Sequence, residues 1–306
     1  FSYKIIYYYS KNNLFSFLSS IFFLFSPIFL DRIYFHLSLI AHWLILWAIY
    51  VSIKSLNKKR FDYKWLAILT ISLLTNFYFF LIVVSIFSFF WIFNKNYNLL
   101  NRIKIIGFSY FYSLIILYLF GFFDINVVNY ATYGFGFYKS NLLTLFDSSG
   151  GISSRNWSYF NIFDFKNVDG EQAGFGYLGF GGILLFFILL SNLFFNNKIK
   201  INFKILLFTI LFFLISITHN VHIGEYNLFT LDLNKYLYGL LSFTRASGRF
   251  IFVVYYIICI LGFILVYKYF SKTNSIYICA FILFIQILDI SSIFFEKNNM
   301  IKKNYQ

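Results

Sequence analysis

Apolar stretches dominate this chain and limit it to a membrane fold. They approach the roughly 20 residues that an α-helix needs to cross a bilayer. The whole chain of 306 residues is 60% hydrophobic and only 12% charged, which is too apolar for a soluble domain. We therefore expect an all-α bundle of transmembrane helices that forms a single domain over residues 1–306. The stretches are residues 12–30, 35–53, 64–93, 103–122, 175–195, 202–218, 250–270 and 274–295.

Basic residues gather in short loops between these stretches and indicate how the helices are oriented. Cytoplasmic loops of membrane proteins carry an excess of lysine and arginine, so we predict that these loops and the N-terminus are cytoplasmic. Most acidic residues lie in the other loops. The same pattern accounts for the net charge of +14 and argues against a nucleic-acid partner. The basic loops are residues 4–11, 54–64, 95–104, 198–204 and 268–272.

The stretch at residues 64–93 lies between two basic loops, so it must return to the side from which it started. The polar pair Thr75 and Asn76 in its middle is the predicted turning point of a hairpin of two short helices. This brings the count to about nine membrane segments and places the C-terminal tail outside. Because the chain starts at Phe1 and ends just after an apolar stretch, we expect it to be a piece of a longer protein.

Two polar segments, about residues 123–174 and 219–249, are predicted to be structured extracytoplasmic loops. Their aromatic content is higher than disordered segments allow. In the second loop, His219, His222 and Glu225 have a spacing that would suit zinc ligands on a helix, and an open zinc site needs three such ligands. Asparagine and glycine interrupt any helix there, so we predict a loop without a metal.

Arg245 and Arg249 stand where the apolar stretch at residues 250–270 begins. If this region is helical, their spacing puts both guanidinium groups on one face, where two rigid forks suit a phosphate group. The alternative is that they only anchor the helix end at the membrane surface. The loop charges place the pair on the outer side, where the distribution of basic residues does not require arginine. This position favours the phosphate site.

A second group of ionisable residues lies around one outer turn near the N-terminus: Asp31, Arg32, His36 and His42. Ionisable residues near membrane depth are functional candidates. The alternative is an Asp–Arg pair at a helix end, with the histidines satisfied by their neighbours.

Several polar or small residues inside apolar stretches favour a structural role. Asp289, near Gln286, is expected to face the bundle and pair with another polar group. The glycines at residues 174–182 indicate close helix packing, because no strand precedes them as a dinucleotide site requires. Cys259 and Cys279 are expected to be buried as small apolar side chains.

Three ordered motifs carry a resemblance to a known family. They are Ser26–Pro27 with Arg32, His36 and His42–Trp43; Tyr138, Asn141 and Asp147 followed by Gly-Phe-Gly-Tyr-Leu-Gly at residues 174–179; and Arg-Ala-Ser-Gly-Arg-Phe at residues 245–250 with Tyr255–Tyr256. In this order they resemble domain-of-unknown-function family 6311, bacterial polytopic membrane proteins placed near the GT-C glycosyltransferases. The chain departs from the family pattern at Ala173, where a glutamate is expected, and Glu171 lies two residues earlier. A Trp-Pro pair expected after the third motif is replaced by Phe252 and Val253.

The resemblance implies a GT-C-like glycosyltransferase of the bacterial inner membrane, which moves a sugar from a polyprenyl-phosphate donor to an acceptor at the outer face. Positive charge would stabilise the phosphate leaving group, a role for Arg32, Arg245 or Arg249. A carboxylate would take the proton of the attacking hydroxyl, a role for Asp31. No cofactor is expected, although a divalent metal is compatible with this chemistry. The remaining candidate substrate-binding residues are His36, His42, Tyr138, Asn141, Glu171 and Ser247.

Two other classes of function stay open. A transporter or flippase of lipid-linked saccharides would need polar residues through the whole depth of the bundle. The apolar stretches offer few of these, chiefly Asn76, Gln286 and Asp289, which favours chemistry at the outer face. A membrane assembly subunit without a substrate is the other alternative.

Overall fold

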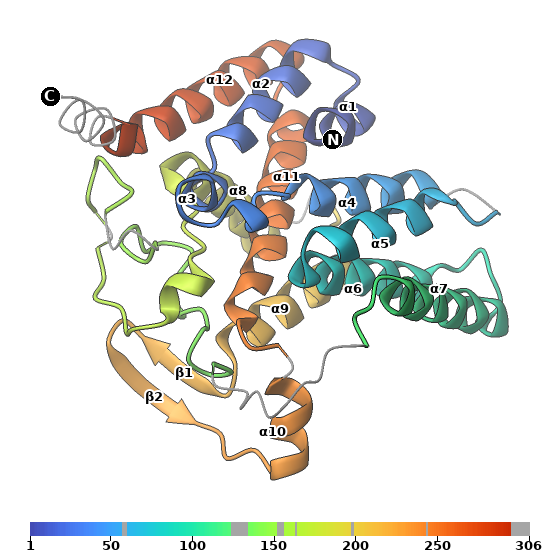
Figure 1. The fold of residues 1–306 in the computed structure, drawn as a ribbon. Helices are drawn as coiled ribbons and strands as arrows, with labels where there is room; N and C mark the ends of the chain where they lie inside the picture. The colour runs from blue at the N-terminus through green and yellow to red at the C-terminus, as the bar shows by residue number, and fades with distance from the viewer. Residues whose placement is uncertain are drawn as a thin grey trace, which may run out of the picture. The chain divides into compact units, whose positions relative to one another are not determined.

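A computed structural model of the chain describes residues 1–56, 60–123, 134–151, 156–162, 164–196, 199–242 and 244–294. Parts of the predicted loop 123–174 and the C-terminal tail lie outside these residues. The chain divides into two compact units: unit 1 is Phe1 with residues 38–131, and unit 2 is residues 2–37 with 132–306 (Figure 1). The single transmembrane domain stays a prediction.

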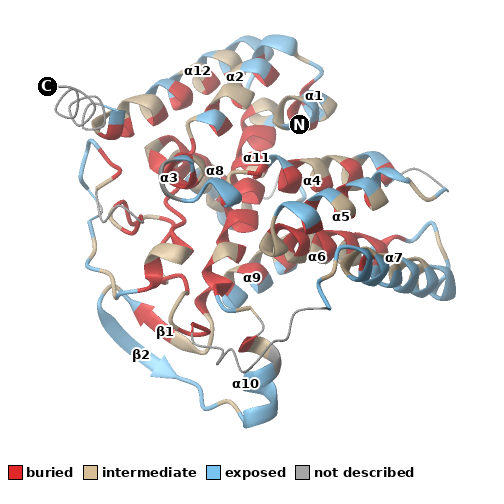
Figure 2. Ribbon diagram, viewed as in Figure 1, coloured by how far each residue is buried: buried red, intermediate tan, exposed pale blue. Residues whose placement is uncertain are grey.

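Unit 1 is built around helix α6, which packs against its three helical neighbours. Aromatic side chains fill its core, where Trp65 meets the ring of Phe87 edge-on at 5.1 Å. Helix α7 is mainly exposed (Figure 2), and many of its exposed side chains are apolar, as a lipid-facing helix requires. The elements are η1 (Leu37–Leu39), at the boundary with unit 2, and α4 (Trp43–Ser55), α5 (Lys64–Thr75), α6 (Phe77–Phe93) and α7 (Leu99–Leu119).

The predicted turning point at Thr75–Asn76 is confirmed. Asn76 has extended backbone angles, and its N–H donates to the carbonyl of Ser72 at 3.0 Å, which ends α5. Its side-chain oxygen accepts from the N–H of Tyr78 at 2.9 Å, which caps the start of α6. One asparagine thus ends one helix and starts the next, and α5 and α6 pack against each other.

Unit 2 surrounds helix α11, which contacts α1, α8, α9 and α12. Almost every residue from Ile251 to Val266 is buried, as expected for a helix that is apolar on all faces. Its elements are α1 (Ser2–Ser10), α2 (Asn13–Leu24), α3 (Pro27–Phe35), η2 (Glu171–Gly174), α8 (Gly179–Ser191), η3 (Asn192–Asn196), α9 (Phe203–Ile217), β1 (Asn220–Ile223), β2 (Tyr226–Thr230), α10 (Lys235–Ser242), η4 (Ser247–Phe250), α11 (Ile251–Tyr269) and α12 (Lys272–Asp289).

The chain bends by 48° between α2 and α3. Pro27 starts α3, where its missing N–H costs nothing. The carbonyl of Phe25 accepts from the side chain of Gln286 at 3.1 Å. Gln286 therefore satisfies a backbone carbonyl that the bend leaves without a helical partner.

The predicted packing roles near α12 are confirmed. A methyl group on Gly181 would lie 2.6 Å from the carbonyl oxygen of Ile282, so α8 and α12 are in backbone contact there. Asp289 is buried, and its carboxylate accepts from the hydroxyls of Tyr177 and Ser158 and from the N–H of Phe180. Cys259 and Cys279 are both buried and free.

Four helical segments among the described residues are long and apolar enough to cross a membrane, and the bent pair α2–α3 could supply a fifth. Helices α5, α6, α8 and α9 are apolar but shorter. The chain is therefore mostly helical and consistent with a membrane protein, whereas the count of nine segments stays a prediction. The four segments are Leu37–Ser55, Leu99–Leu119, Ser247–Tyr269 and Lys272–Asp289.

Candidate functional site

Two glycines let three distant segments of unit 2 cross in close contact. A methyl group on Gly248 would lie 2.6 Å from the Cα atom of Gly174, and one on Gly174 would lie 2.5 Å from the Cα atom of Ser140. The buried hydroxyl of Ser140 lies within hydrogen-bond distance of both glycine carbonyls, at 3.1 and 3.2 Å. This crossing brings residues 138–141, the end of η2 and the Arg245–Arg249 motif together, although they are far apart in the sequence.

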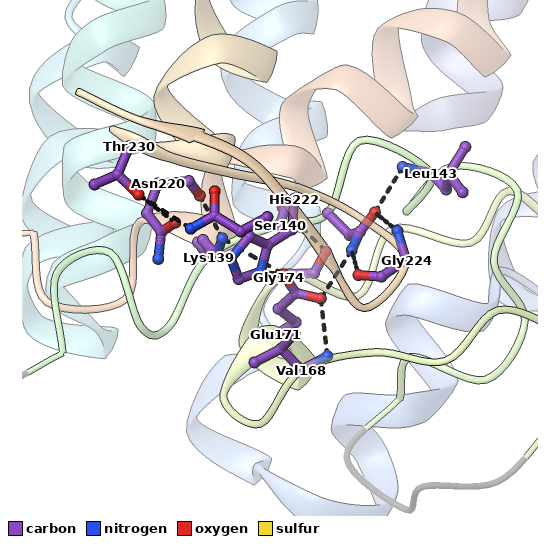
Figure 3. A network of polar contacts seen from close by, with 12 residues as sticks. Lys139, Ser140, Leu143, Val168, Glu171, Gly174, Asn220, His222, Gly224 and Thr230 are labelled. Atoms are coloured by element: carbon purple, nitrogen blue, oxygen red, sulfur yellow. Dashed lines mark hydrogen bonds and ion pairs between the residues drawn. The ribbon is translucent and has the colours of Figure 1, made fainter.

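Glu171 lies at the start of η2 and is the centre of a buried polar network (Figure 3). Its carboxylate accepts from the side-chain amide of Asn141 at 2.9 Å and from the N–H of Val168 at 3.3 Å. The ring nitrogen Nδ1 of His222 lies 3.1 Å away, and the ammonium of Lys139 lies 3.6 Å away. A carboxylate with this many partners is fixed in position, so its first role is to hold its neighbours together.

Lys139 is the cationic member of this network, and its side chain is 2% exposed. Its ammonium also donates to the carbonyl of Asn220 in β1. Burial lowers the pKa of Lys139 to about 8, although the carboxylate of Glu171 acts in the opposite direction. Lys139 therefore loses its proton more readily than a lysine in water.

Residues 220–230 form a hairpin of β1 and β2, where the sequence predicted a loop. Asn141 fixes the turn, because its side chain both donates to the carbonyl of Gly224 at 2.8 Å and accepts from its N–H at 3.1 Å. Two strands can form here because tertiary contacts of this kind compensate for the weak stability of an isolated hairpin.

The hairpin separates the three residues with zinc-like spacing. His222 pairs with Glu171, whereas His219 stacks on Phe135 at 5.2 Å and Glu225 lies exposed in the turn. Partial burial, and then the charge of Lys139, lower the pKa of His219. Within the described ranges, no three His, Cys, Asp or Glu residues are grouped for a metal ion.

Arg32 is 1% exposed and ties α3 to η2 and α11. Its guanidinium donates to the carbonyls of Gln172 and Ala173 at 3.2 and 3.1 Å and lies over the ring of Phe252 at 5.4 Å. These carbonyls end η2, where a cation is electrostatically favoured. Arg32 therefore contributes its charge from a fixed, buried position.

Asp31 is fully buried beside Arg32, with 3.7 Å between the carboxylate and the guanidinium. A methyl group on Gly151 would lie 2.9 Å from its Oδ1 atom, so the segment at Gly151 covers this carboxylate. A base that takes a proton from a bound hydroxyl must come within hydrogen-bond reach of it. Asp31 could do so only if that segment moved aside.

His36 and Arg249 form the more accessible part of the same cationic group. His36 is exposed, and Arg249 is partly exposed in η4, just before α11 begins. Partial burial, followed by the charges of Arg32 and Arg249, lowers the pKa of His36. Arg32 lies over the ring of Phe252, three residues after Arg249, and its carbonyl accepts from the N–H of His36 at 2.9 Å. Candidates from two separate motifs therefore lie near the start of α11.

Arg245 departs from the geometry expected of the arginine pair. The helical turn η4 begins only at Ser247, so Arg245 lies before it and does not share a helix face with Arg249. Instead, its guanidinium lies exposed over the ring of Tyr138 at 5.3 Å. Each arginine thus has its own environment, and Arg249 is the one grouped with His36 and Arg32.

The remaining candidates lie inside the protein. Ser247 is fully buried at the start of η4, and its hydroxyl has no hydrogen-bond partner among the described residues. His42 belongs to unit 1, where it is buried at the start of α4 and meets the ring of Phe79 edge-on at 5.7 Å. His42 is therefore described apart from Arg32 and His36, although the three are close in sequence.

Sequence reasoning missed Lys139 and the pairing of Glu171 with His222. The distribution of charge held a signal for Lys139, because it is a basic residue in a loop predicted to be outside, as the two arginines are. The Glu171–His222 contact joins residues 51 positions apart in a network that no local spacing predicts.

Comparison with known proteins agrees with the ordered motifs. No curated protein and no solved structure matches the chain significantly. A family model described as "Domain of unknown function (DUF6311)" matches residues 1–291, which is almost the whole chain. The chain therefore belongs to the DUF6311 family.

Proposed function

We propose that this chain is a GT-C-like membrane glycosyltransferase that moves a sugar from a polyprenyl-phosphate donor to an acceptor at the outer face of the bacterial inner membrane. The proposal is carried by the position of Arg32, which lies over the ring of Phe252, three residues after Arg249, where the candidate span Ser247–Tyr269 begins. His36 ends the same short helix as Arg32, and its N–H donates to the carbonyl of Arg32 at 2.9 Å. A lipid-linked donor holds its phosphate at headgroup level while its polyprenyl chain lies in the bilayer. A cationic group at the end of a membrane helix suits that phosphate in both charge and depth.

The proposed reaction forms one bond and breaks one at the anomeric carbon of the sugar. The acceptor oxygen attacks this carbon, and the bond to the phosphate oxygen breaks with its electron pair going to the phosphate. Arg249, supported by the buried charge of Arg32, stabilises the negative charge that develops there. Asp31 receives the proton of the acceptor hydroxyl once the segment at Gly151 has moved aside. We propose that the reaction needs no cofactor and is compatible with a divalent cation that accompanies the donor phosphate.

The polar residues inside the bundle favour this proposal over transport. Asn76 caps two helices, Gln286 satisfies the backbone at the α2–α3 bend, and Asp289 accepts three hydrogen bonds. All three therefore have structural partners. A translocation pathway through the bundle would need polar groups that are available to a cargo.

Binding of a polyprenyl phosphate to the protein in nanodiscs tests the site, with native mass spectrometry as the readout. We expect Arg249→Ala to weaken binding about tenfold or more, since a charge-assisted contact contributes about 1.5–3 kcal/mol. Arg245→Ala tests whether the second arginine takes part, and Lys166→Ala, an exposed outer lysine, is the control. Sugar transfer is then measured with a panel of polyprenyl-phosphate sugars.

If both arginine variants bind polyprenyl phosphate and transfer sugar as the wild type does, the arginine hypothesis is wrong. Binding that depends on Arg249 without transfer of any sugar would retain the phosphate site and argue against the enzyme. Circular dichroism of each variant tests whether it is folded, so that a loss of binding or of sugar transfer can be distinguished from unfolding.

A further inference from the structure

The segment from β2 to α10 belongs to the connection between helices α9 and α11. It exposes a large apolar surface. Tyr236 is 90% exposed and Tyr226 is 70% exposed. Leu228, Phe229 and Leu231 are each more than half exposed. Figure 2 shows both β2 and most of α10 as exposed.

Exposed apolar side chains on a membrane-spanning helix face lipid, but this explanation does not cover residues 226–238. β2 is a strand of five residues, and α10 has eight residues, which makes it about 12 Å long. Neither can cross a bilayer. In water, these side chains would form an apolar patch of the kind that marks a contact surface.

Both ends of this segment are tied to apolar helices. Only two residues separate the end of α9 at Ile217 from the start of the hairpin at Asn220, and the N–H of Leu231 donates to the carbonyl of His219 at 2.8 Å. At the other end, four residues separate α10 from η4, where the candidate span Ser247–Tyr269 begins. Four residues reach at most about 14 Å, so the exposed surface stays near the ends of these helices.

The chemistry of the segment matches a bilayer interface. Tyrosines, leucines and a phenylalanine are interspersed with polar residues and two charged ones, Asp232 and Lys235, as in aromatic belts and interfacial helices. Among the described residues, β2 pairs only with β1, so its other edge needs water or headgroups for its backbone groups. This favours a shallow position at headgroup depth.

We propose that the β2–α10 segment rests in the outer leaflet of the bilayer, with Tyr226, Leu228, Phe229 and Tyr236 among the lipid headgroups. The proposal goes beyond sugar transfer and does not depend on it. By anchoring the hairpin, the lipid surface would fix the orientation of the polar network around Glu171 relative to the bilayer.

Fluorescence quenching in phosphatidylcholine nanodiscs tests this position. A single cysteine at Tyr236→Cys or Leu228→Cys carries a small fluorophore, and the buried native thiols of Cys259 and Cys279 do not compete for it. Lys166→Cys, an exposed site in the other outer loop, is the control. The quenchers are aqueous iodide and lipids with a nitroxide at a shallow or a deep acyl position.

We expect the shallow nitroxide to quench both test sites at least threefold more than the control site, and iodide to quench them less. Equal access of iodide to test and control sites would overturn the proposal, because the segment would then lie in water. Protection from iodide without quenching by either nitroxide lipid would also overturn it. In that case a protein surface, such as a second copy of the chain, covers the segment.

Discussion

The carboxylate of Glu171 lies 3.6 Å from the ammonium of Lys139, and each side chain is 2% exposed. Both charges are buried away from water, so each is stabilised by the other and by nearby hydrogen-bond donors and acceptors. Asn141, Val168 and His222 complete the coordination of the carboxylate. The pair thereby joins the β1–β2 hairpin to η2, whose last carbonyls hold Arg32.

Lys139→Met should destabilise the protein by about 3–5 kcal/mol, because it leaves the charge of Glu171 buried without its cation. The double variant Lys139→Met with Glu171→Gln should recover much of this loss, since neither charge then remains and the amide oxygen can still accept from Asn141. Unfolding of the purified protein in detergent measures both effects. Lys166→Met, at an exposed lysine, should stay within about 0.5 kcal/mol of the wild type, and a similar loss there would contradict the role of the pair.

The same lysine predicts how stability depends on pH. Burial lowers the pKa of Lys139 from 10.5 to about 8. Between these values the unfolded chain holds a proton that the folded chain has released, so the contribution of Lys139 to the free energy of unfolding rises with pH. The rise is at most about 1.4 kcal/mol per pH unit, and below pH 8 the lysine adds no slope. The free energy of unfolding of the wild type and of Lys139→Met is measured from pH 7 to pH 10. The difference between the two proteins should rise over this range, and it would be independent of pH if Lys139 had the pKa of an ordinary lysine.

Patterns that act locally could be predicted from the sequence. The break at Asn76 follows from one polar pair in a long apolar stretch, and the pairing of Asp289 follows from the cost of a lone carboxylate at membrane depth. The hairpin at residues 220–230 could not be predicted, because Asn141, 83 residues away from Gly224, fixes its turn. Likewise, Arg245 and Arg249 have separate environments because the helical turn begins only at Ser247, which spacing along the chain does not reveal.

That glycine contact gives a third prediction. Gly248→Ala should destabilise the protein by about 1–3 kcal/mol, because the added methyl meets the backbone of Gly174 and Lys139 and neither can yield as a side chain would. Gly239→Ala in α10 is the matched control, since no atom lies within 4 Å of its added methyl. It should be neutral or stabilise α10 by up to about 1 kcal/mol. Thermal unfolding under the same conditions compares the stability of the two variants. Equal stability would contradict the close contact between Gly248 and Gly174.

Substitutions of Asp289 distinguish a structural role of this buried carboxylate from a role in binding the ligand. Asp289→Ala leaves the hydroxyls of Tyr177 and Ser158 and the N–H of Phe180 without their acceptor, so it should cost about 3 kcal/mol or more. Asp289→Asn keeps one acceptor oxygen and should cost less. If the role is structural, the fraction of either variant that remains folded should bind polyprenyl phosphate with wild-type affinity in nanodiscs. Weakened binding by folded Asp289→Asn would instead connect this carboxylate to the ligand and contradict a purely structural role.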